Sequence, residues 1–130
     1  MALEDKVQDH LVTDDESILE SNLEAVEKLF QLHEDGTINI QAPYRGVSEK
    51  MQILIYLIGQ RYAFEGGLVD IDQVKSEYFY NRIGKSDRSV RNYLQDLRDS
   101  GLVAKEGQGS HRLIAENLPE ALDRIESETD

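Results

Sequence analysis

Four polar side chains in the second half of the sequence have types and spacing suited to contacting the edges of base pairs. They are Arg88, Arg91, Asn92 and Gln95. On a helix these positions share one face, because residues three and four apart lie above one another. Arginine forms paired hydrogen bonds with guanine, and asparagine and glutamine form them with adenine, in the major groove of DNA. The pattern therefore predicts a helix with a base-contacting face.

The same stretch predicts where this helix begins and ends and which face it buries. Ser86 is suited to cap the first turn and Gly101 to end the helix, which gives a range of 87–100. Apolar residues occupy the opposite face, namely Val90, Leu94 and Leu97. We expect that face to pack against a core.

Further polar residues flank this helix and are placed to contact the phosphate backbone. Arg82 and Lys85 precede it, and the hydroxyl group of Ser86 or Ser89 is suited to bind a phosphate beside the N-terminal N–H groups. After the helix, two short strands joined by a glycine-rich tip are predicted at 102–105 and 112–115. Four side chains on or beside this hairpin have matching chemistry: Lys105, Gln108, His111 and Arg112. We expect them to approach the DNA backbone or the minor groove.

Upstream of that helix, the apolar pattern predicts three more elements. A helix between Ser48 and Gly66 carries apolar residues nearly all round it, so it is expected to be the buried centre of the fold. A short strand and a second helix then lead to a tight turn at Gly84 and Lys85. The expected ranges are 68–71 for the strand, 72–83 for the second helix, and 118–125 for a short amphipathic helix near the end of the chain.

The stretch 85–103 resembles the recognition helix and following turn of winged-helix transcriptional regulators. The matching positions are Ser86, Ser89-Val90, Leu94, Leu97 and Gly101-Leu102-Val103. The resemblance extends over about 46–115 and identifies no subfamily. It implies a mainly α fold with a small β-wing, and a dimeric regulator that binds double-stranded DNA in a sequence-specific manner. The recognition helix 87–100 would enter the major groove, and the wing 102–115 would contact the backbone or minor groove.

The N-terminal region predicts a long acidic amphipathic helix in front of this domain. Thr13 to Glu16 match a capping box, and one apolar seam follows through 14–35. The seam consists of Leu19, Leu23, Val26 and Phe30, continued by His33. It either folds back onto the core or pairs with a second copy in a homodimer, and the acidic helix is also a possible surface for a protein partner.

These expectations divide the chain into four parts. A flexible acidic tail precedes the acidic helix, and a strand or extended linker at 37–41 leads from that helix to the winged-helix domain. A short helix and an acidic tail close the chain. The boundaries are 1–13 for the first tail, 14–45 for the helix and linker, 46–117 for the winged-helix domain, and 118–130 for the C-terminal part.

The charge distribution is compatible with DNA binding although the net charge is −12. Residues 1–44 carry eleven acidic side chains against two lysines, and 116–130 carry six against one arginine. Residues 45–115 carry eleven basic against nine acidic side chains. The excess acid therefore lies outside the middle of the chain. The chain has 26 acidic residues but only six lysines, a balance that resembles the surfaces of proteins from salt-loving organisms. The alternative is an ordinary acidic surface.

Other classes of function have little support in the sequence. The sequence contains no cysteine, so it can form neither a disulfide nor a thiolate metal site. No apolar run approaches the ~20 residues of a membrane span. We therefore expect a cytoplasmic protein. His10, His33 and His111 lack metal-ligand spacing, and no nucleophile motif occurs, so we expect no catalytic residue, metal or cofactor. Two alternatives to DNA binding remain. In the first, the basic face of the helix 87–100 is only solvated or paired with nearby acidic side chains. In the second, the winged helix binds another protein within a larger assembly.

Overall fold

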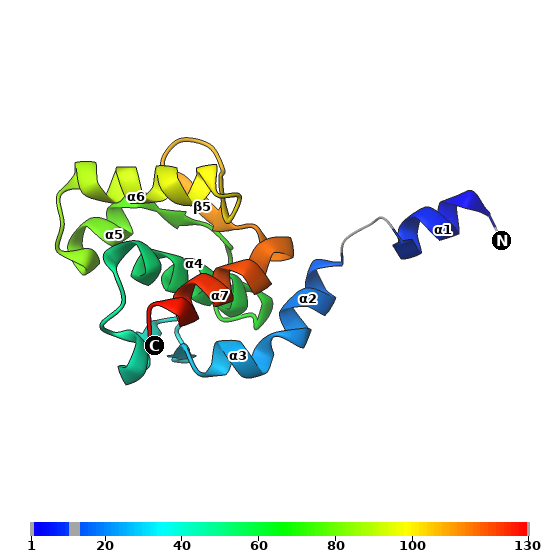
Figure 1. Ribbon diagram of the computed structural model, residues 1–130, viewed down its shortest axis with the longest axis horizontal. Coiled ribbons are helices and arrows are strands. Elements are labelled where there is room, and N and C mark those ends of the chain that lie inside the picture. Colours follow the sequence, from blue (N-terminus) through cyan, green and yellow to red (C-terminus); the bar gives the residue numbers. More distant parts are fainter. Residues whose placement is uncertain (1, 11–13, 130) are drawn as a thin grey trace.

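Helix α4 (Glu49–Glu65) lies at the centre of the computed structural model, which describes residues 2–10 and 14–129 (Figure 1). Its first turn is capped by Ser48, whose Oγ accepts a hydrogen bond from the backbone N–H of Met51 at 3.4 Å. Eight of its seventeen residues are buried, and they occur on most sides of the helix. The expected central buried helix is therefore confirmed.

A three-stranded antiparallel sheet and two helices pack on one side of α4. The strands are β3 (Val74–Lys75), β4 (Val103–Lys105) and β5 (Ser110–Leu113), in the order β3-β5-β4. Helices α5 (Ser76–Ile83) and α6 (Asp87–Asp99) are consecutive, separated by residues 84–86. The described chain is thus mainly helical with small antiparallel sheets, which agrees with the coarse fold class expected from the sequence.

The strand expected at 68–71 lies instead at Val74–Lys75, and the helix expected from Asp72 begins at Ser76. Val74 pairs with His111, and Lys75 pairs with Ser110. This pairing joins segments far apart in the sequence, so local periodicity gives no sign of it. Leu68 lies in the turn that closes α4, where its N–H donates to the Ala63 carbonyl at 2.9 Å.

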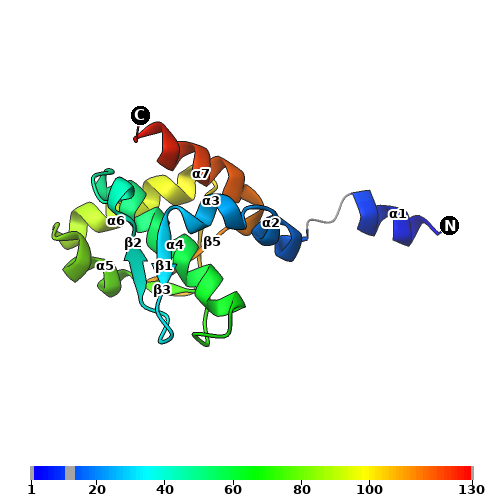
Figure 2. The same ribbon diagram turned by 90° about the horizontal axis from the view of Figure 1, so that it is seen from below.

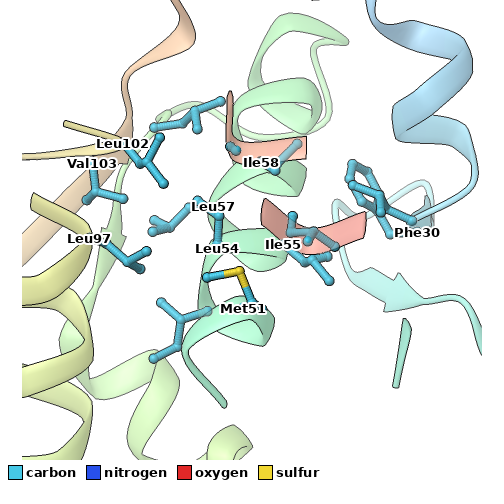
Figure 3. Close-up of a cluster of buried hydrophobic side chains, with 14 of the residues drawn as sticks. Phe30, Met51, Leu54, Ile55, Leu57, Ile58, Leu97, Leu102 and Val103 are labelled. Carbon is cyan, nitrogen blue, oxygen red and sulfur yellow. The ribbon is translucent and has the colours of Figure 1, made fainter. Parts of the chain in front are cut away.

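A second, two-stranded sheet covers another side of α4. Strands β1 (Phe30–Leu32) and β2 (Ile38–Ile40) are antiparallel, with Phe30 opposite Ile40. The strand expected within 37–41 is therefore confirmed as β2. The core side chains of α4 lie between Phe30 of this hairpin and Leu97 and Val103 of the α6 side (Figure 3).

The single long helix expected over 14–35 is wrong. The chain forms α2 (Asp15–Ser21), a break at Asn22, α3 (Leu23–Glu27) and then β1. At the break, the Asn22 side chain donates to the Ile18 carbonyl at 2.7 Å, and Ser21 Oγ donates to the Ser17 carbonyl at 2.7 Å. Short polar side chains that bond the backbone in this way compete with helix continuation.

Gly36, directly after the helix predicted over 14–35, forms the turn between β1 and β2. Its φ is +90°, in the region that favours glycine, and its N–H donates to the His33 carbonyl at 2.9 Å. Phe30/Leu32 and Ile38/Ile40 alternate with polar residues on the two sides of this turn. That period of two is the sequence signal for a hairpin, and the helical spacing of Val26 and Phe30 concealed it.

The seam proposed for dimerisation is largely used inside the chain. Leu19, Val26 and Phe30 are 3–5% exposed and belong to the same core as α4, whereas Leu23 is 50% exposed. Tyr62 Oη on α4 donates to the Leu19 carbonyl at 2.6 Å, which fixes α2 against the core. Of the two placements left open by the sequence, the structure has the intramolecular one for Leu19, Val26 and Phe30, whereas Leu23 stays exposed.

A helix lies near each end of the described chain. Helix α1 (Leu3–His10) lies within the segment 1–13 that was expected to be a flexible acidic tail, and it projects away from the other elements (Figures 1 and 2). Asp14 caps α2 by accepting hydrogen bonds from the N–H groups of Glu16 and Ser17, and Thr13, the expected cap, lies outside the described residues. Helix α7 (Leu118–Ser127) confirms the short helix expected near the end of the chain. Short 3-10 turns occur at Ala42–Tyr44 and Ala115–Asn117.

None of the helices in the described ranges combines the length and apolar character needed to cross a membrane.

Candidate functional site

Helix α6 forms as its sequence predicts and exposes the expected polar face. Ser86 Oγ accepts a hydrogen bond from the Ser89 N–H at 3.2 Å, which caps the helix, and Gly101 follows its end with φ of +78°. One face is buried in the core through Val90, Leu94 and Leu97. The side chains exposed on the opposite face are Arg88, Arg91, Asn92 and Gln95. The expected base-contacting residues therefore share one solvent-facing surface.

The basic side chains of this face are not neutralised by the nearby acids. Asp96 pairs with Lys50 on α4 at 3.8 Å, and Asp99 accepts a hydrogen bond from Gln95 at 2.8 Å. Within the described residues, no ion pair or hydrogen bond engages the side chains of Arg88 and Arg91. The alternative in which local carboxylates pair with these arginines is thus not realised.

Gln95 differs from its neighbours on this face because its amide is already bonded. Its Oε1 accepts from Arg98 at 2.6 Å, and its Nε2 donates to Asp99 at 2.8 Å. Contact with a base would require exchange of these exposed bonds. Arg88, Arg91 and Asn92 are therefore the side chains on α6 that are ready to bind a ligand without rearrangement.

The residues expected to hold phosphates before α6 lie at the surface but have local partners. Arg82 stacks on the ring of Tyr78, with the guanidinium carbon 4.1 Å from the ring centroid. Lys85 pairs with Glu49 at 3.5 Å, and Ser86 Oγ bonds Ser89 Oγ at 3.1 Å. These contacts leave the charges of Arg82 and Lys85 exposed, so both residues remain able to attract an anion.

The β4–β5 hairpin separates its four predicted residues. Lys105 and Gln108 are exposed, and Arg112 forms an ion pair with Glu106. Side chains alternate along a strand, so Arg112 and His111 face opposite sides of the sheet. The hairpin therefore offers Lys105 and Gln108 as free polar side chains, with Arg112 in a salt bridge on the other side.

His111 is not available to a partner as expected from the sequence. Its side chain is 3% exposed, because it lies on the inward face of β5 beneath α6. Its Nε2 lies 2.7 Å from a terminal nitrogen of Arg98, so Nε2 accepts and the proton of the neutral ring is on Nδ1. Burial, followed by the charges of Arg98 and Lys105, lowers the pKa of His111 to about 4.

A hollow of about 260 Å³ lies between α5, α6 and the hairpin. It brings together Arg91, Lys105, Gln108 and His111 from the predicted set. It also includes Arg98, which the sequence analysis left out although Arg98 follows Arg91 by two helical turns. That spacing was the available signal, because residues seven apart lie on the same side of a helix.

No family model, curated protein or solved structure matches this chain. Within the described part of the chain, no three His, Asp or Glu side chains gather closely enough to hold a metal ion. The site is therefore defined by its own residues, which are an exposed polar face on α6 and a basic hollow beside it.

Proposed function

We propose that the chain is a winged helix-turn-helix protein that binds double-stranded DNA, with α6 in the major groove and the β4–β5 hairpin as the wing. The order of elements supports this proposal. Helix, strand, helix, short turn, helix and hairpin follow one another from α4 to β5. The turn at 84–86 has the three-residue length and the glycine common between the two helices of a helix-turn-helix.

The observation that carries the proposal is the exposed face of α6, on which Arg88, Arg91 and Asn92 have no side-chain partner among the described residues. Arg88, Arg91 and Asn92 point to solvent in a chain whose net charge is −12. In a strongly acidic protein, two exposed arginines that no carboxylate of the described residues pairs with form a surface suited to an anionic ligand. The asparagine and arginine types add hydrogen-bonding geometry specific for adenine and guanine.

In this proposal the protein catalyses no reaction. It acts by occupying a promoter or by recruiting another protein to it, as a transcriptional regulator in the cytoplasm. Phosphate contacts from Arg82, Lys85 and the N-terminus of α6 would set its position on the duplex, and Arg88, Arg91 and Asn92 would select the sequence. A homodimer on two half-sites remains a prediction, but it would need a surface other than the buried seam.

Fluorescence anisotropy with labelled duplexes tests the proposal. We would compare DNA from upstream of the protein's own gene with random duplex of equal length across a salt series. The expected result is binding to the upstream duplex that persists at salt concentrations where random duplex is released, because base contacts do not depend on counterion release.

A double variant, Arg88→Ala/Asn92→Ala, tests the assigned face of α6. Each paired base contact is worth ~1–3 kcal/mol, so the variant should bind the upstream duplex at least about tenfold more weakly. Its melting temperature should be nearly unchanged because both side chains are exposed. Arg124→Ala is the matched control, since Arg124 lies on α7 and pairs with Glu120. Equal affinity of both variants and wild type would refute the assignment.

A second candidate function, binding of a protein partner, is favoured by an apolar groove formed by α2, α3, β1 and the end of α4. Its floor is made by Leu19, Leu23, Val26, Phe30, Leu32 and Tyr62. Acidic side chains stand on its rim, namely Glu16, Glu20, Glu27 and Glu65. This combination is complementary to a basic amphipathic helix of another protein.

Calorimetry with a synthetic Leu/Lys amphipathic peptide tests this second function. Leu23→Asp should abolish binding without unfolding the protein, because Leu23 is 50% exposed. A scrambled peptide of equal charge is the control. If the scrambled peptide binds equally well, the attraction is only electrostatic and the groove is not a docking site.

A further inference from the structure

The hollow between α5, α6 and the β4–β5 hairpin concentrates positive charge in an acidic protein. Arg91 and Arg98 reach it from α6, and Lys105 reaches it from β4. Glu77 is the one carboxylate among the described residues that line it. No ion pair joins Glu77, or any other carboxylate in the described ranges, to these three bases. Among the described residues, the hollow therefore has three basic side chains against one carboxylate, and none of the three is in an ion pair.

His111 forms the floor of the hollow and holds one of these bases in place. Its Nε2 accepts a hydrogen bond from Arg98, whose other terminal nitrogen donates to Gln95. A guanidinium carries five N–H donors, so these two bonds leave Arg98 with donors for another acceptor. Two fixed contacts orient the guanidinium in advance, which reduces the entropy lost when it binds an anion.

The remaining lining supplies neutral donors. Tyr80 of α5 contributes a phenol that is half-buried, and Gln108 contributes an exposed amide from the hairpin tip. The volume of about 260 Å³ is below the ~300–1,000 Å³ usual for pockets that hold drug-sized ligands. Its size and its donors suit a small oxyanion with several acceptor oxygens.

We propose that this hollow is a binding site for a phosphoryl group, held by Arg91, Arg98 and Lys105. The group belongs either to the DNA backbone or to a free phosphate or phosphate monoester. If the phosphoryl group belongs to DNA, the inference rests on the proposed function. If it belongs to a free anion, the inference is independent of that function. In the first case the hollow fixes one phosphate between the wing and α6. In the second case a small anion occupies the hollow, and DNA does not use it.

The test is a titration of the full chain with inorganic phosphate, in which the NMR chemical shifts of the backbone amides are measured at each phosphate concentration. Ionic strength is held constant with chloride so that general screening does not contribute. Saturable shifts are expected in α6 and in the hairpin, and chloride alone should not produce them. No DNA is present, so this result does not depend on the proposed function.

Two variants assign the site. Arg91→Gln/Lys105→Gln should weaken phosphate binding at least about tenfold, because two charge-assisted contacts are lost. Both side chains are exposed, so the fold should be retained. Arg124→Gln on α7 is the matched control and should bind phosphate as wild type does. Absence of saturable shifts in wild type, or equal binding by the double variant, would overturn the proposal.

The single variant Lys105→Gln identifies the source of the group, because it leaves the side chains assigned to base contacts on α6 unchanged. If Lys105→Gln weakens the binding of both phosphate and duplex, the site accepts a backbone phosphate. If it weakens phosphate binding but retains duplex binding, the site accepts a free anion. Both outcomes support the phosphoryl site, and the assay with Arg88→Ala/Asn92→Ala judges DNA recognition separately.

Discussion

Acidification should destabilise the folded protein through His111. The imidazole is 3% exposed, it accepts a hydrogen bond from a guanidinium, and Lys105 lies opposite it in the β4–β5 pair. Protonation would place a third positive charge beside Arg98 and Lys105 and remove the acceptor on Nε2. These conditions lower the pKa of His111 from 6.5 to about 4, with burial as the main cause.

The direction and size of the effect follow from this shift. Between pH 6.5 and about 4, the unfolded chain binds a proton at His111 that the folded chain does not bind. The contribution to stability is therefore fully present above pH 6.5 and is lost as the pH falls toward about 4. With 1.36 kcal/mol per pK unit, the loss between about pH 7.5 and about pH 5 is ~2 kcal/mol.

Urea unfolding of wild type and His111→Gln at these two pH values measures the effect. Glutamine accepts a hydrogen bond from Arg98 but does not titrate, so the other ionisable groups cancel in the comparison. Wild type should lose ~2 kcal/mol more than the variant on acidification. Equal losses would refute the argument. If the variant does not fold, NMR titration of the imidazole in wild type gives the folded pKa directly, and a value near 6.5 would refute it equally.

Two further predictions concern the contacts of α4 with the N-terminal region. Gly59→Ala should lower the melting temperature, because a Cβ at this position would lie 2.9 Å from side-chain carbons of Ile38. The cost of this crowding, ~1–3 kcal/mol, is expected to exceed the ~1 kcal/mol that alanine gains in helix propensity. Gly46→Ala is the control, with no atom of the described chain close to the new methyl group, and equal melting temperatures would contradict the prediction. Tyr62→Phe should cost ~1 kcal/mol in urea unfolding through loss of the bond to the Leu19 carbonyl, whereas unchanged stability would show that this bond contributes nothing.

The elements nearest the site were the most predictable from the sequence. Ser86 and Gly101 set the ends of α6 through local capping and turn geometry, and Val90, Leu94 and Leu97 set its buried face through helical periodicity. Both signals are confined to a short window of sequence. The exposure of Arg88, Arg91 and Asn92 then followed, because a helix with one buried face exposes the other.

The errors arose where distant segments decide the structure. His111 has the same polar character as Gln108, and only the pairing of β5 with β3 and β4 turns its side chain under α6. Phe30 fitted a helical seam by spacing, but pairing with Ile40 places it in a strand. Long-range pairing of this kind overrides local periodicity, because side-chain packing across the pair determines which conformation is stable.

The position of α4 has a consequence for how the chain unfolds. The helix contacts α5, α6, α7 and β5, and it also contacts both strands of the β1–β2 hairpin. Separation of either group of elements would expose apolar side chains of α4 to water while the other group remains attached. Neither the hairpin region nor the α5–β5 region is therefore a cooperative unit by itself. We expect one unfolding transition shared by both, and a fragment that lacks the first forty residues should fail to fold although it retains every residue of α6.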